Sequence, residues 1–134
     1  MRLHVGYWAP QQPIVLEVML RNPKTGGFLP KQLLILDTGF RGLKAVALSL
    51  GTCRRLGLGI KGSTVVRSAS GFQDTLIADD VTVEVMGRRV LSNVIVVELD
   101  PGLISLDLAS SLFDSLEIDF HSGKVWAEID GTQK

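Results

Sequence analysis

The fold of this chain is decided by one stretch, Leu33-Leu34-Ile35-Leu36-Asp37-Thr38-Gly39, in which four aliphatic residues run directly into a carboxylate. A continuous apolar run of this length is typical of a strand that is buried on both faces. We therefore expect Asp37 at the end of a core strand. An ionised carboxylate in such a place needs hydrogen bonds or a shared proton to offset its lost hydration, which makes Asp37 a candidate acid or base.

The two residues after Asp37 fit a catalytic loop. Gly39 permits a tight turn and lets its N–H approach the carboxylate, and the Thr38 hydroxyl can both donate and accept a hydrogen bond. The tripeptide alone is a weak signal, because an ordinary Asp-Gly turn, in which the carboxylate bonds its own backbone, has the same sequence. The choice between a catalytic loop and a structural turn depends on the rest of the chain.

Composition narrows the class of protein. With 134 residues, of which 46% are hydrophobic, the chain is long enough for one domain, residues 1–134, whose core needs no disulfide or metal. The formal net charge is zero, so the chain lacks the excess positive charge that is typical of proteins that bind nucleic acid or an anionic membrane, and we expect neither as a partner. The single cysteine, Cys53, favours a reducing compartment, the cytoplasm, and an apolar packing role. Residues 1–8 alternate too regularly for a secretory segment, and no apolar run reaches membrane-spanning length.

The remaining residues predict short strands and two short helices. Strands are expected at 3–7, 14–20, 33–37, 44–48, 64–67, 75–78, 80–86, 89–99, 116–120 and 125–129. One helix is expected at 49–56, opened by Ser49 and closed by Gly57, and another at 108–113, capped by Asp107. The segment Ser68-Ala69-Ser70-Gly71-Phe72 predicts the tip of an exposed hairpin. The fold class is therefore all-β, mainly strand with one or two short helices.

The segment Gly57-Leu58-Gly59-Ile60-Lys61-Gly62 matches the glycine pattern of dinucleotide-binding loops. That site needs a strand before the glycines and a helix after them, so that the pyrophosphate meets a helix N-terminus. Here the expected order is reversed, with a helix before and a strand after. We therefore interpret these glycines as a helix stop followed by a loop.

Three segments resemble, in their order and spacing, the retropepsin-like aspartic proteases, and most closely the small prokaryotic single-domain members of that clan. The segments are Leu36-Asp37-Thr38-Gly39-Phe40-Arg41-Gly42, residues 102–113 and residues 116–120. In that family a buried strand ends in Asp-Thr-Gly, a β-hairpin flap follows, and a hydrophobic-hydrophobic-Gly segment leads into a short helix and a last hairpin. The resemblance implies a closed acid-protease barrel that supplies one half-site per chain.

The resemblance also implies a homodimeric aspartic endopeptidase that uses no metal or other cofactor. The chain contains one Asp-Thr-Gly and no second Asp-Thr-Gly or Asp-Ser-Gly, so a single copy cannot supply two catalytic carboxylates. Two Asp37 carboxylates, one per subunit, would hold a water between them and share one proton, since like charges so close cannot both ionise. The ionised carboxylate would then take a proton from the water, while the protonated one would donate to the peptide carbonyl.

Further roles follow from the same resemblance. The Thr38 hydroxyl would join the two loops across the twofold axis, and the Gly39 N–H would support the carboxylate. A flap would close over the peptide or protein substrate, exclude water and orient the scissile bond. The residues expected in that flap are Ala69, Ser70, Gly71 and Phe72.

The chain also departs from the family pattern. Ser105 stands where the family has glycine, the flap is not rich in glycine, and Phe40 and Arg41 replace small or acidic residues of the viral relatives. The terminal strands that hold viral dimers together have no clear counterpart. A second hypothesis therefore stays open, in which the chain is a retropepsin-fold module that dimerises and binds peptides with little turnover. We favour the enzyme, because the whole Asp-Thr-Gly tripeptide is present after an apolar strand.

Overall fold

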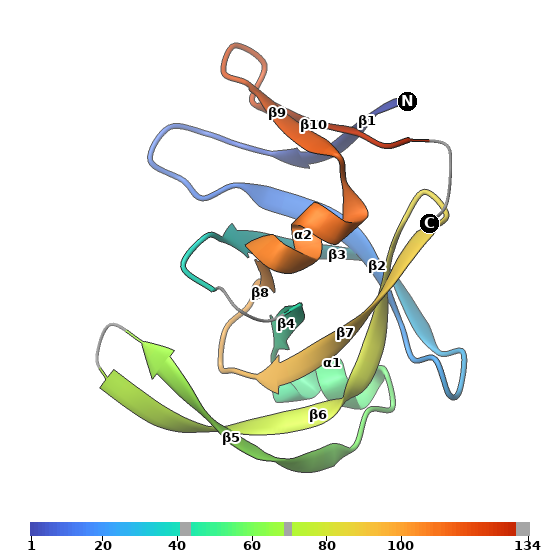
Figure 1. The fold of residues 1–134 in the computed structure, drawn as a ribbon, viewed down its shortest axis with the longest axis vertical. Helices are drawn as coiled ribbons and strands as arrows, with labels where there is room; N and C mark the ends of the chain where they lie inside the picture. Colours follow the sequence, from blue (N-terminus) through green and yellow to red (C-terminus); the bar gives the residue numbers. More distant parts are fainter. Residues whose placement is uncertain (41–43, 69–70, 131–134) are drawn as a thin grey trace.

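The computed structural model describes residues 1–40, 44–68 and 71–130, and most of them lie in strands (Figure 1). These residues form ten strands and two short helices. In chain order the elements are β1 (Arg2–Tyr7), β2 (Val15–Arg21), β3 (Phe28–Asp37), β4 (Ala45–Leu48), α1 (Leu50–Arg55), β5 (Ile60–Ser68), β6 (Gly71–Val85), β7 (Arg88–Val96), β8 (Gly102–Ser105), α2 (Leu106–Leu112), β9 (Ser115–Asp119) and β10 (Lys124–Glu128). The all-β class predicted from the sequence is confirmed.

Six strands close into a barrel. The strand order is β5-β6-β7-β4-β8-β3-β2-β1-β10-β9, and an additional pairing of β6 with β2 joins the two ends of the run from β6 to β2. Inward-facing aliphatic side chains from these strands fill the barrel, and Leu16, Leu34, Val46 and Ile104 are among those almost entirely buried. The closed barrel expected from the family resemblance is thus present.

Two parts of the sheet extend beyond the barrel (Figure 1). The hairpin of β5 and β6 projects from the lower side of the view, and β1, β9 and β10 form a separate edge above α2. Within that edge, β1 pairs with β10 and β2, and β9 pairs with β10. The terminal strands therefore pair with one another inside a single chain, and β9 forms the outer edge of the sheet.

Burial of β3 differs from the expectation. Leu34 is almost fully buried, but Leu33 is 47% exposed, and Ile35 and Leu36 are only half-buried. The strand forms part of a barrel wall, so its alternate side chains face the interior and the outside. The prediction of a strand buried on both faces was wrong for this reason.

The second helix also begins differently. α2 starts at Leu106, and its N-cap is Ser105, whose hydroxyl accepts the Leu108 N–H at 3.1 Å. The sequence predicted Asp107 as the cap, but Asp107 lies in the first turn of the helix. The first helix begins after the predicted cap, Ser49, and stops before Gly57, which adopts a left-handed φ of 72°.

Two predicted strands, 75–78 and 80–86, form the single strand β6, because a register shift between Ala78 and Val81 lets the strand bend without ending. β8 was expected only as a segment leading into the helix. The glycine segment after α1 leads into β5, which confirms that helix precedes strand there. Within it, the Gly59 N–H donates to Asp79 Oδ2 at 2.9 Å.

Candidate active site

Asp37 is the last residue of β3, a strand that pairs with β2 on one side and β8 on the other. The side chain is half-buried, and its Oδ1 accepts the Gly39 N–H at 2.9 Å. The Phe40 N–H donates to the Asp37 carbonyl at 3.2 Å, which turns the chain immediately after the carboxylate. The carboxylate is therefore held by its own loop at the end of the barrel wall.

The loop has little room at Gly39. A Cβ placed there would lie 3.3 Å from Asp37 Oδ1, so any side chain would press on the carboxylate. Thr38 and Gly39 are both exposed in the single chain. The tripeptide thus presents a carboxylate of defined position on an open surface.

The strand beside Asp37 comes from the C-terminal half of the chain. β8 lies between β3 and β4, and Asp37 stands opposite Ser105 in the parallel β3–β8 ladder. Ser105 is completely buried, and its hydroxyl accepts N–H groups from both Ala45 and Leu108. Sequence reasoning missed this role, although a serine directly before a helical segment is a recognisable N-cap signal.

A row of apolar side chains runs across the barrel on the face that carries Asp37. Residues that are paired directly across neighbouring strands lie on the same face of the sheet, and so do residues two apart on one strand. Ile35 lies two residues before Asp37, so the row of residues paired through Ile35 is on the same face as Asp37. Its Ala47 and Ile95 are buried, and its other members are half-buried. In strand order the row is Ile77, Ile95, Ala47, Leu103, Ile35 and Val15.

The β5–β6 hairpin stands where a flap was expected. Ala69 and Ser70 of the predicted flap lie outside the described residues, whereas Gly71 pairs with Ser68 at the described end of the hairpin. Phe72 is 77% exposed, and strand alternation places it on the opposite face from Ile77. The structure therefore turns Phe72 away from the apolar row.

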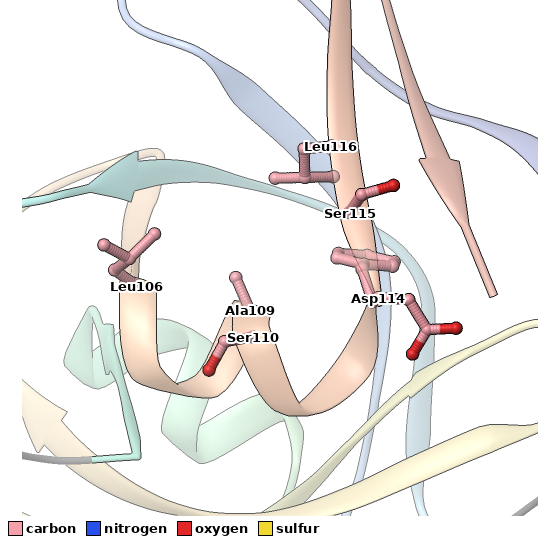
Figure 2. Close-up of a pocket in the computed structure, with 7 residues that line it drawn as sticks. Leu106, Ala109, Ser110, Asp114, Ser115 and Leu116 are labelled. Carbon is pink, nitrogen blue, oxygen red and sulfur yellow. The ribbon is translucent and has the colours of Figure 1, made fainter. Parts of the chain in front are cut away.

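A separate hollow of about 230 Å³ lies between α2 and β9 (Figure 2). It is lined by Leu106, Ala109, Ser110, Phe113, Asp114, Ser115 and Leu116, and no residue of the Asp37 tripeptide lines it. Its acid, Asp114, accepts the Asp130 N–H at 2.7 Å and forms an ion pair with Arg88. That carboxylate is engaged in structural contacts, so the hollow is not a second acidic centre.

Other reactive groups have structural explanations. Cys53 is fully buried, and burial raises the pKa of its thiol, which disfavours the reactive thiolate. Within the described part of the chain, no three His, Cys, Asp or Glu side chains gather in a way that could hold a metal ion. Neither of the helices described is long and apolar enough to cross a membrane.

No known family model matches the sequence, and no curated protein does either. Solved structures do match the fold. A retropepsin-like aspartic protease from Rickettsia conorii matches with a TM-score of 0.57 at 17% identity, over 94% of this chain and 98% of that one. EIAV protease in complex with the inhibitor HBY-793 matches with a TM-score of 0.55 at 18% identity, over 77% of this chain and 90% of that one. The chain therefore has a retropepsin-like fold.

Proposed function

We propose that this retropepsin-like chain is an aspartic endopeptidase that acts as a homodimer. The observation that carries the proposal is the position of Asp37, at the end of a barrel strand with Oδ1 on the Gly39 N–H and an apolar row on the same face. A carboxylate at the end of this strand is accessible to an extended peptide that lies along the apolar row. The solved structures of similar fold support the proposal, since both are named as proteases.

The reaction needs two carboxylates, and the chain holds one Asp-Thr-Gly. In the proposed dimer two Asp37 side chains share one proton and bind a water between them. The ionised carboxylate removes a proton from the water as it attacks the peptide carbon, and the protonated carboxyl donates to the carbonyl oxygen. The resulting tetrahedral intermediate collapses when the nitrogen of the leaving amine gains a proton and the C–N bond breaks. No cofactor is required for any of these steps.

The dimer contact is expected around the Asp37 loop. Thr38 and Gly39 are exposed on the surface of the single chain, and in the proposed dimer the Thr38 hydroxyl joins the two loops. The terminal strands β1 and β10 are paired on both sides within the chain, whereas β9 pairs only with β10 and leaves its outer edge open. This arrangement differs from one in which termini of two chains interleave. The unpaired cysteine is consistent with the cytoplasmic location that we also propose.

The apolar row suggests the substrate. Ile35 and Leu103 are paired with each other, and each lies two residues before the Asp37–Ser105 pair. Both are half-buried aliphatic side chains beside the carboxylate, so they can contact hydrophobic side chains of a bound peptide. We propose extended peptides with hydrophobic residues near the scissile bond, with the β5–β6 hairpin, including Gly71, closing over them.

The test is cleavage of a diverse peptide library from acidic to neutral pH by wild type and Asp37→Asn, with the oligomeric state measured in parallel. Asp37→Asn is expected to lower kcat by about 10²- to 10⁴-fold, because the shared proton and the general base are lost. Asp80→Asn is the matched control, since Asp80 is a carboxylate on β6 that pairs with Lys61. Equal cleavage by wild type and Asp37→Asn, or a strictly monomeric active protein, would contradict the proposal.

One observation favours a second candidate, the peptide-binding module with little turnover. The Gly39 N–H bond to Asp37 Oδ1 is also the bond that a purely structural turn would make. Asparagine can form the same turn, so in the module Asp37→Asn would retain peptide binding and dimerisation. A wild-type protein that binds peptides and cleaves none across the pH range would favour the module.

A further inference from the structure

Ser105 is a buried polar residue whose hydroxyl joins two distant parts of the chain. It has no exposed surface, and its Oγ accepts the Ala45 N–H at 3.2 Å and the Leu108 N–H at 3.1 Å. The second bond caps α2, as serine commonly does. The first bond reaches β4, a strand 60 residues earlier in the sequence, and no cap requires it.

Ser105 contacts both ends of the segment that joins β3 to β4 and contains Thr38 and Gly39. The chain leaves β3 at Asp37 and enters β4 at Ala45. Ser105 stands opposite Asp37 in the β3–β8 ladder, and its hydroxyl takes the backbone N–H of Ala45. One residue therefore contacts the exit from β3 through its backbone ladder and the entry into β4 through its side chain.

Removal of the hydroxyl would leave two buried N–H groups without an acceptor, which favours local movement of the backbone. The first of these groups belongs to Ala45, at the end of the segment that contains Thr38 and Gly39. Because β8 pairs with both β4 and β3, movement at Ala45 shifts the strand that stands opposite Asp37. A small displacement of a catalytic carboxylate is enough to slow a reaction strongly.

We infer that Ser105 is a positioning residue for Asp37, which fixes the exit from β3 through its place in the β3–β8 ladder and the entry into β4 through its hydroxyl. The inference rests on the proposed peptidase function, because the effect is read through Asp37. Ser105 itself does not contact the substrate in this role. Glycine, which the family that the chain resembles has at this position, has no hydroxyl to accept the N–H of Ala45 or of Leu108. The proposed positioning therefore depends on the serine of this chain.

The first test compares three variants well below their unfolding temperatures, at concentrations that give the same oligomeric state. Ser105→Ala is expected to lower kcat by roughly 10- to 100-fold with little change in KM, and Ser105→Thr, which keeps the hydroxyl, to recover most of the rate. Ser49→Ala is the matched control. Ser49 caps α1 through the Thr52 N–H in the same manner, but it lies on the opposite side of β4 from the Asp37 loop in chain order. Equal kcat values for Ser105→Ala and Ser49→Ala would overturn the inference.

The second test is independent of turnover. Amide hydrogen exchange is expected to speed up by about 10-fold or more at Ala45 and Gly39 in Ser105→Ala, and to stay at the wild-type rate at both amides in Ser49→Ala. Unchanged exchange at Gly39 in Ser105→Ala would refute the positioning role. A wild-type protein without peptidase activity would instead refute the proposed function, while the exchange rates would still decide whether Ser105 holds the loop.

Discussion

Gly102 offers the sharpest test of how the Asp37 strand is supported. This residue begins β8, and a Cβ added to it would lie 2.1 Å from the Ala47 carbonyl oxygen and 3.4 Å from Leu34 Cδ2. Contact with a carbonyl oxygen at 2.1 Å is far inside van der Waals separation, so β8 would have to move away from β4 by about 1 Å. In Gly102→Ala this movement strains the strand that pairs with Asp37.

The expected loss of stability for Gly102→Ala is about 1–3 kcal/mol, the range for overpacking in a well-packed interior. For a chain of this size each 1 kcal/mol corresponds to roughly 4 °C in Tm. Gly62→Ala is the control, because Gly62 also lies in a strand but a Cβ there meets nothing within 4 Å. That variant is expected to be neutral or stabilised by about 0.4–1 kcal/mol, since alanine restricts the unfolded chain.

Urea and thermal unfolding followed by circular dichroism measure both variants. Because β8 carries the Ser105 partner of Asp37, peptidase activity of folded Gly102→Ala should fall as well, and that of Gly62→Ala should not. If the two variants unfold at the same urea concentration, the close approach of β8 to β4 does not constrain the strand, and the reasoning fails.

Two further predictions concern the barrel seam and the thiol. The side chain of Glu84 is only 9% exposed, and its carboxylate bonds Arg21 and Arg89 on the neighbouring strands. Glu84→Gln is expected to lower the stability by about 1–3 kcal/mol, against less than about 1 kcal/mol for Asp80→Asn, which breaks an exposed ion pair. Equal losses in urea unfolding would contradict a role of Glu84 in closing the barrel. Burial raises the pKa of Cys53 above its ordinary value of 9.0, so the thiol of the unfolded chain ionises first and stability is retained below pH 9.0 and lost as the pH rises above it. Cys53→Ala should lack this decline, and identical pH profiles for the two proteins would refute the assignment.

Local features were predictable from the sequence because they depend on neighbouring residues. The apolar run before Asp37 indicated a strand, Ser49 and Gly57 marked the ends of α1, and the small residues from Ser68 onward indicated a hairpin tip. The position of the carboxylate after a strand followed in the same way. Each depends on backbone preference or on a hydrogen bond between residues a few positions apart.

Contacts between distant segments were decided only by the tertiary structure. The exposure of Leu33, the face on which Phe72 lies and the second bond of the Ser105 hydroxyl all depend on which strand lies beside which. Strand pairing joins residues far apart in the chain, and a one-residue change of register reverses every face. The sequence by itself therefore determined that an acid follows a strand, whereas only the folded barrel determined which side chains surround that acid.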